Sequence, residues 1–335
     1  MKVSPRQTGR RLQAAFLQNP RIQPLVEGLV PLEGYDLIWN HGPAGRLHQW
    51  HLTENACDLF EFSLANLLIT RGSPDLAHLR WMAVPTFLSK AAMWLKFFVH
   101  EQAGIESFAD LRGKRVGVPD FHMTAAVWMR IVLRELYGIG PEDISWVNGR
   151  DASATHGHGV SQGQLKPGIE FESVTEGQTL NGLLHAGKID AAFGDSHSAL
   201  VSPGAEVRRF PADVGRRVFA DFHAATGMTP TNHVLVVQQK MIDDDPGFPM
   251  LLFDAFEESK QLAYRRARRE AAGYLVLAET DFARNAADFG EDPYPRGMAA
   301  NRRMVQTIAD EMLDEGLLSQ PVTLDSVFAA ATLDT

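Results

Sequence analysis

The chain of 335 residues contains a single cysteine, Cys57. One thiol excludes an intramolecular disulfide and any metal site built from several cysteines. Because Cys57 stands among apolar residues, we expect a buried structural thiol rather than a nucleophile. The sequence also has no apolar run of about 18 residues, so we predict no membrane-spanning helix.

Three common catalytic signatures are missing as well. No glycine-rich dinucleotide fingerprint follows the first predicted strand, and the sequence has neither a phosphate-binding glycine loop nor a Gly-x-Ser-x-Gly motif. Their absence disfavours hydride transfer with a dinucleotide, ATP chemistry and serine hydrolysis. The formal net charge of −9 argues against a general binder of nucleic acids or anionic membranes.

Two histidine pairs have spacings that resemble those of metal ligands. They are His48 with His51 and His156 with His158. Neither pair is accompanied by a cysteine or by an obvious third ligand. We therefore predict that the protein holds no metal.

The residues that are present indicate a globular protein of two lobes. Hydrophobic residues make up 45% of the chain and charged residues 22%, which is ordinary for a soluble protein, and the length favours more than one core.

An arginine pair near the N-terminus is followed by a stretch broken by polar residues, without a small-residue cleavage site. We interpret this stretch as a first strand and expect a cytoplasmic location.

Short β-like runs alternate with helical patterns over most of the chain. This alternation predicts a mostly parallel α/β architecture. From Pro246 onward the pattern is almost entirely helical. The stretch from Val147 to Gly168 is rich in Gly, Ser and His, and it predicts a long mobile loop. The strand-like runs include residues 11–17, 35–39, 57–63, 79–87, 94–100, 114–119, 169–174, 189–194 and 233–239.

Polar side chains follow three of the predicted strands, where ligands of open α/β sheets collect. The first set is Glu61 with Ser63, which can cap a following helix. The second lies in Asp120–Thr124, which includes His122, and the third is Asp195–His197. Each set also has a plain interpretation as helix caps or solvated loop side chains.

Thr124 precedes an apolar run with helical periodicity that extends to Tyr137. It fits the position of an N-cap, which would leave the N–H groups of Ala125, Ala126 and Val127 open to an oxygen ligand. Capping without any ligand is an equally good interpretation of the local sequence.

The segment SFADLRGKRVGVPDFHMTAAVWMRIVLRELYGI resembles the start of the second lobe of type II periplasmic-binding-protein folds. More narrowly, it is similar to the 4,5-dihydroxyphthalate decarboxylase family, in which a strand ending in Val-Pro precedes a Met-Thr-Ala-Ala-x-Trp run. Further stretches match the family in order, over nearly the whole chain. They are VPLEGYDL, ACDLFEFSLANLLI, TGMTPTNHVLVVQQ and the C-terminal DPYPRGMAANRRMVQTIADEMLDEGLLSQPVTLDSVF.

The resemblance implies a two-lobed α/β fold in which each lobe is a mixed sheet flanked by helices, with a helical C-terminal region. Lobe one would comprise residues 1–97 and 233–335, and lobe two residues 98–232. Two crossover strands would form the hinge, and the substrate would lie in the cleft between the lobes. The implied reaction is cofactor-independent, non-oxidative decarboxylation of a hydroxylated aromatic acid, through protonation of the ring carbon that bears the carboxylate. The partner is then a small aromatic carboxylate, with oligomeric state left open.

The resemblance also suggests roles for particular side chains. His122 and His233 are the candidates for proton transfer, because imidazole titrates near neutral pH, and Glu61 is the candidate acceptor for ring hydroxyls. Thr124 and the following N–H groups would hold a carboxylate, and Lys90 would add positive charge. The remaining expected substrate contacts are Ser63, Met123, Asp195, His197 and Asn232.

The chain departs from the family pattern at two places. Lys90 stands where the family has an arginine, and Met93-Trp94 replaces an Arg-His pair. After the strand near 190, Asp195-Ser196-His197 replaces a Pro-Arg pair. Because lysine does not bind a carboxylate in the bidentate manner of arginine, we expect a substrate with one carboxylate, or with two held differently. A non-catalytic binding protein and another cleft enzyme on the same scaffold remain alternatives.

Overall fold

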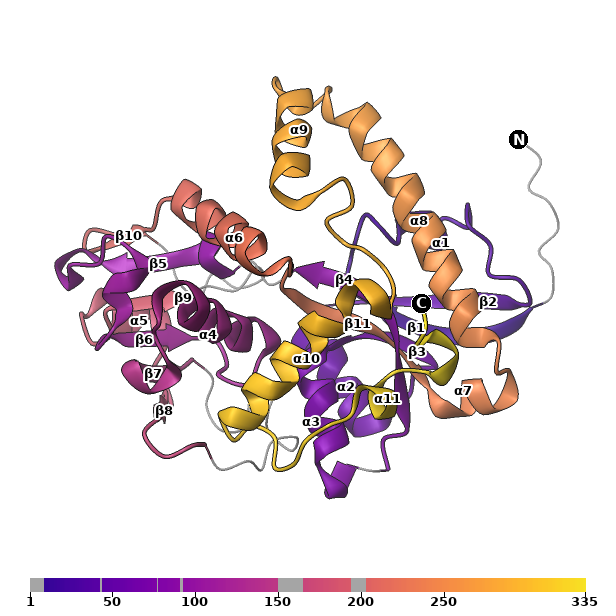
Figure 1. Cartoon of the computed structure of the whole chain (residues 1–335), viewed down its shortest axis with the longest axis horizontal. Helices are drawn as coiled ribbons and strands as arrows, with labels where there is room; N and C mark the ends of the chain where they lie inside the picture. The colour runs from indigo at the N-terminus through magenta and orange to yellow at the C-terminus, as the bar shows by residue number, and fades with distance from the viewer. Residues whose placement is uncertain (1–8, 43, 77, 91–92, 150–164, 194–202) are drawn as a thin grey trace.

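The structure, a computed structural model, describes residues 9–42, 44–76, 78–90, 93–149, 165–193 and 203–335. The described strands form two separate sheets that lie side by side (Figure 1). Helices cover the faces of both sheets, and a group of C-terminal helices adjoins both lobes. None of the described helices is long and apolar enough to cross a bilayer.

The first sheet has the strand order β2-β1-β3-β11-β4. Its strands are β1 (Arg10–Phe16), β2 (Tyr35–His41), β3 (Leu59–Ser63), β4 (Trp81–Lys90) and β11 (Thr231–Gln238). β1 runs parallel to β2 and β3, whereas β11 runs antiparallel to both of its neighbours, β3 and β4. The chain therefore returns from the second sheet into the interior of the first, between β3 and β4.

The second sheet has the strand order β10-β5-β9-β6-β7-β8. Its strands are β5 (Phe97–His100), β6 (Arg115–Val118), β7 (Ser145–Asn148), β8 (Glu170–Ser173), β9 (Ala191–Phe193) and β10 (Val207–Arg209). β5 is antiparallel to β9 and β10, and the pairs from β9 through β6 and β7 to β8 are parallel. Each sheet thus contains one antiparallel strand among parallel ones.

The helices that follow the strands pack on the sheets and on one another, and α10 reaches elements of both lobes. α8 lies against α1 and β4, while α10 packs on both α3 and α4. The described α-helices are α1 (Gln23–Val26), α2 (Ala44–Glu54), α3 (Leu64–Gly72), α4 (Thr124–Tyr137), α5 (Leu180–His185), α6 (Ala212–Thr226), α7 (Gln239–Asp244), α8 (Phe248–Ala271), α9 (Ala278–Phe289), α10 (Met298–Asp314) and α11 (Leu324–Val327).

The predicted strands and the helical C-terminal region are confirmed, but five of the described elements were missed. These are α2, α6, α7, β7 and β10. The expected loop from Val147 to Gly168 was wrong at its start, because Val147 and Asn148 belong to β7; residues 150–164, which include His156 and His158, lie outside the described residues. The lobe boundaries and the hinge stay predictions.

Cys57 lies in the interior, and its burial explains why its thiol is unreactive. Cys57 is fully buried beside β3, and this burial raises the pKa of its thiol to about 12. Since the thiolate is the reactive form, the side chain acts as a small apolar residue, as the sequence predicted.

A buried ion pair ties α4 of the second lobe to the C-terminal region. The Arg130 guanidinium donates to both carboxylate oxygens of Glu315, at 2.5 and 2.6 Å, and neither side chain is exposed. Arg130 also donates to the Phe121 carbonyl oxygen at 3.0 Å and stacks on the Phe121 ring, 3.9 Å from its centroid. The same guanidinium therefore fixes the loop that precedes α4. Next to it, burial and the Glu315 carboxylate raise the pKa of Glu311 to about 8.

His51 of α2 is a second buried polar group. Its ring is fully buried and stacks on Phe60, with 4.0 Å between the ring centroids. Neither ring nitrogen has a hydrogen-bond partner among the described residues. Burial lowers the pKa of this imidazole to about 4, so His51 is neutral at neutral pH.

This burial predicts a loss of stability in acid. The unfolded chain binds a proton at His51 below about pH 6.5 and the folded chain only below about pH 4, so stability falls as the pH drops through this window, by at most about 3 kcal/mol. His51→Phe retains the stacking and removes the titration. Urea unfolding of both proteins from pH 7 to 4 should show a shallower decline for the variant. Equal slopes would contradict the assignment.

Candidate active site

The centre of the candidate site is a contact between a carboxylate and an imidazole at the carboxyl end of β3. Glu61 Oε1 accepts a hydrogen bond from His233 Nδ1 at 2.7 Å. The Glu61 side chain is 1% exposed and the His233 side chain 14%. The second carboxylate oxygen, Oε2, accepts from the Leu17 N–H at 3.2 Å, just after β1. Both carboxylate oxygens are therefore held from neighbouring strands.

The strand register explains why these side chains meet. In the antiparallel pair β3–β11, Leu235 stands opposite Glu61 and His233 opposite Ser63. Glu61 and His233 are thus diagonal neighbours on one face of the sheet, within reach of long side chains. On its other side β11 shifts register against β4 around His233. Such irregularities re-aim side chains at functional sites.

The N-termini of α3 and α4 meet beside this pair. The Ser63 and Thr124 hydroxyls share a hydrogen bond of 2.9 Å, and Thr124 Oγ1 accepts from the Ala65 N–H at 3.0 Å. Ser63 caps α3, as predicted, by accepting from the Asn66 N–H at 3.3 Å. Because helix N-termini carry partial positive charge, this corner favours a bound carboxylate.

The predicted role of Thr124 as the N-cap of α4 was wrong. The cap residue is Met123, and Thr124 is the first residue of the helix. The N–H groups of Ala126 and Val127, expected to be open, both donate to the Met123 carbonyl oxygen, at 2.9 and 3.1 Å. An N-cap carbonyl accepts the first bonds of its helix, so the Thr124 side chain is left to reach across to α3.

His122 lies in the loop between β6 and α4, two residues before Thr124. Its Nδ1 is 3.5 Å from Asp120 Oδ1, and its side chain is 18% exposed. Asp120 is fully buried and accepts from the His122 N–H at 3.0 Å. The Phe121 N–H donates to Asn148 Oδ1 at 3.0 Å. The backbone of the loop is therefore held at Phe121 and at His122, as preorganised sites require.

The remaining predicted site residues are only partly placed. Met123 and Asn232 are half-buried, next to Thr124 and His233 respectively. Lys90 ends β4 with its backbone opposite Thr231, but its side chain lies outside what the structure describes. Asp195 and His197 fall in residues 194–202, also outside the described residues. The structure thus brings Glu61, Ser63, Thr124 and His233 into one constellation.

One neighbour of the pair was missed as part of the site. His48 of α2, only 2% exposed, meets the His233 ring edge to face, with 5.1 Å between the centroids and 82° between the planes. From the sequence, His48 was interpreted only as a candidate metal ligand. Among the described residues, no three His, Cys, Asp or Glu side chains are arranged to hold a metal ion. The overlooked signal is helical spacing: Leu47, His48 and His51 share the buried face of α2.

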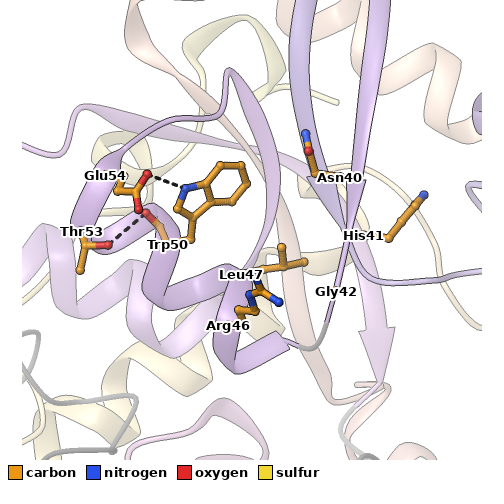
Figure 2. A pocket seen from close by; sticks show the side chains of 8 residues that line it. All are labelled: Asn40, His41, Gly42, Arg46, Leu47, Trp50, Thr53 and Glu54. Carbon is orange, nitrogen blue, oxygen red and sulfur yellow. Dashed lines mark hydrogen bonds between the residues drawn. The ribbon is translucent and has the colours of Figure 1, made fainter.

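α2 also borders a separate cavity of about 580 Å³. Figure 2 shows Arg46, Leu47 and Trp50 of α2 on one side and Asn40 and His41 of β2 on the other. Arg46 supplies a cation and Trp50 an indole ring. The Glu61–His233 pair is not part of its lining, so this cavity is distinct from the candidate site.

The fold is that of periplasmic binding proteins of two lobes. The periplasmic aliphatic sulphonate binding protein of Escherichia coli superposes with a TM-score of 0.57 at 15% identity, over 98% of this chain and all of that one. The alkanesulfonate-binding protein of Xanthomonas axonopodis pv. citri gives a TM-score of 0.51 at 13% identity, over 95% and 98% of the chains. At such low identity these likenesses concern the fold alone.

Sequence similarity points to a narrower group. A 4,5-dihydroxyphthalate decarboxylase of Comamonas testosteroni is 29% identical over 326 residues, 97% of this chain and 98% of that protein. Another, of Pseudomonas putida, is 32% identical over 174 residues, 52% of this chain and 66% of that protein. No family model matches the chain. The two relatives confirm the predicted resemblance to 4,5-dihydroxyphthalate decarboxylases.

The Thr124 contacts lead to a stability prediction. Thr124→Val keeps the shape and leaves the buried Ala65 N–H and the Ser63 hydroxyl without their partner, which costs about 1–3 kcal/mol. Thr124→Ser retains the hydroxyl and is the matched control. Urea unfolding at pH 7 should rank the serine variant well above the valine variant. Equal stability of the two variants would contradict the contact.

Proposed function

We propose that the protein is a carboxy-lyase that decarboxylates a hydroxylated aromatic carboxylic acid similar to 4,5-dihydroxyphthalate, bound in the cleft between the lobes. The observation that carries the proposal is the Glu61–His233 contact of 2.7 Å in a chain that is similar over 97% of its length to a 4,5-dihydroxyphthalate decarboxylase. A carboxylate that orients an imidazole is a recurring arrangement for proton transfer.

The chemistry makes two demands on the site. Loss of CO2 leaves the electron pair of the broken carbon–carbon bond on a ring carbon, so that carbon must receive a proton. A ring hydroxyl donates electron density to the ring when a base accepts or shares its proton. The product therefore carries hydrogen where the substrate carried the carboxylate, and no oxidant, reductant or cofactor is needed for balance.

The Glu61–His233 pair matches the second demand. With Nδ1 bonded to Glu61, the Nε2 of His233 is the nitrogen left for a substrate hydroxyl. The neighbouring N-termini of α3 and α4 would favour the substrate carboxylate. His122, on the second lobe, is the candidate donor to the ring carbon, and closure of the lobes would exclude water.

A binding protein for a small carboxylate on the same fold is the second candidate. It is favoured by the two solved structures compared above, which are both named as binding proteins. The candidates differ in outcome: an enzyme releases CO2, and a receptor binds its ligand without turnover. The cytoplasmic location stays a prediction under either function.

The experiment measures CO2 release from 4,5-dihydroxyphthalate and from hydroxybenzoates with one carboxylate. We expect release from at least one of them, with kcat lowered about 10²–10⁴-fold by Glu61→Gln or His233→Gln. Glu106→Gln is the matched control, because the Glu106 side chain is 87% exposed and should leave kcat unchanged. Tight binding without CO2 release would favour the receptor. Turnover unaffected by both site variants would remove the pair from the mechanism.

A further inference from the structure

A hydroxyl without a partner lies next to His233 on the neighbouring strand. Ser89 of β4 stands opposite His233 on one side of β11, and Ser63 of β3 stands opposite it on the other. The Ser63 hydroxyl is engaged by both α3 and α4. The Ser89 hydroxyl oxygen is buried and has no hydrogen-bond partner among the described residues. Burying a hydroxyl in this way is unfavourable, so the stability of the fold does not explain it.

The strand order places Ser89 on the side of His233 that faces away from Glu61. Residues directly opposite each other in an antiparallel pair lie on one face of the sheet, so Ser89 shares the face of the Glu61–His233 pair. Glu61 belongs to β3 and Ser89 to β4, on the two sides of β11. The hydrogen bond of 2.7 Å directs His233 Nδ1 toward β3. An imidazole and an unengaged hydroxyl therefore stand side by side at this end of the sheet.

A β-bulge in β4 sets the direction of the Ser89 side chain. The ladder pairs Ser89 and Phe87 with β11 and passes over Leu88 between them. The Leu88 carbonyl oxygen instead accepts from Asn19 Nδ2, at 2.8 Å, and from Arg21 Nη2. Arg21 Nη1 also donates to the Phe87 carbonyl oxygen at 3.4 Å. Because a bulge re-aims the side chains beside it, these contacts hold Ser89 in its place next to His233.

We propose that the Ser89 hydroxyl binds a second ring hydroxyl of the substrate, adjacent to the one that faces His233 Nε2. This inference rests on the proposed function and narrows the substrate to rings with hydroxyls on two adjacent carbons. Two such oxygens lie about a hydrogen-bond length apart, which suits contacts from paired residues of neighbouring strands. A serine hydroxyl both donates and accepts, so it serves the second oxygen whether or not that oxygen holds its proton.

The contact gives the protein a means of discrimination. A ligand with two adjacent hydroxyls supplies the partner that the Ser89 oxygen lacks. A ligand with one hydroxyl occupies His233 and leaves Ser89 unsatisfied. Sites that hydrogen-bond a ligand hydroxyl reject the analogue that lacks it for this reason. Ser89 is therefore a specificity residue, whereas the Glu61–His233 pair acts on the hydroxyl that both ligands share.

Calorimetric binding measures the discrimination without turnover. The ligands are 4,5-dihydroxyphthalate against 4-hydroxyphthalate, and 3,4-dihydroxybenzoate against 4-hydroxybenzoate, so that the comparison is made with two carboxylates and with one. The wild type should bind the dihydroxy member of a pair about tenfold more tightly. Ser89→Ala should remove this preference, and Ser89→Thr, which keeps the hydroxyl, should retain it. Ser326→Ala, on the exposed side of α11, is the matched control and should bind as the wild type does.

Two binding results would overturn the inference. One is a wild type that shows no preference in either pair, which includes a wild type that binds none of the four compounds. The other is a Ser89→Ala variant that keeps the wild-type preference.

Urea unfolding without ligand separates a ligand contact from a structural role. Because the Ser89 hydroxyl has no partner among the described residues, Ser89→Ala should unfold at the same urea concentration as the wild type or at a higher one. A clear shift to lower urea would show that the hydroxyl supports the fold, and it would overturn the inference.

CO2 release reports separately on the proposed function. A preference that is lost in Ser89→Ala, in a protein that releases no CO2, would support the contact and contradict the carboxy-lyase. CO2 release in which wild type and Ser89→Ala have the same ratio of kcat/KM between the two members of a pair would support the carboxy-lyase and contradict the contact.

Discussion

The insertion of β11 between β3 and β4, antiparallel to both, is the constraint on which the site depends. This strand returns from the second lobe to the interior of the first sheet and sets His233 diagonally across from Glu61. The same strand is held from the second lobe, since the Trp128 indole of α4 donates to the Thr231 carbonyl oxygen at 2.9 Å. Sheet register and lobe contact therefore act on one short segment, Thr231 to His233.

The site combines two kinds of electrostatic support. Glu61 is buried with both oxygens engaged, so its charge is directed at His233 and at the Leu17 N–H. The N-termini of α3 and α4 provide positive potential without a formal charge.

Several features could be predicted from the sequence because local signals agreed with the final environment. Glu61 and Ser63 follow an apolar strand, and Ser63 caps the next helix as its position indicates. The contact between Glu61 and His233 joins residues 172 positions apart, and local pattern does not encode the register that unites them. The resemblance to a family predicted that both residues serve one site, without giving their geometry.

Two of the features that were not predicted correctly are the role of Thr124 and the helix α2, and each error has a physical cause. Thr124 looked like an N-cap, because its hydroxyl and position are right for one, but its true partner is the Ala65 N–H on another helix. α2 was missed because histidines occupy two positions of its buried face, where apolar residues would have revealed the helical period. Buried histidine is rare enough that a pattern of this kind first suggests a metal site.

The Arg130–Glu315 pair has a consequence for the order in which the lobes are completed. The second lobe is encoded in the middle of the chain, yet the counter-charge for its buried arginine stands at residue 315. A guanidinium without its partner in an apolar interior is strongly unfavourable. During synthesis, this contact of the loop that holds His122 therefore forms only after residue 315 has been made. The C-terminal segment acts as the last structural part of a lobe to which it does not belong in sequence.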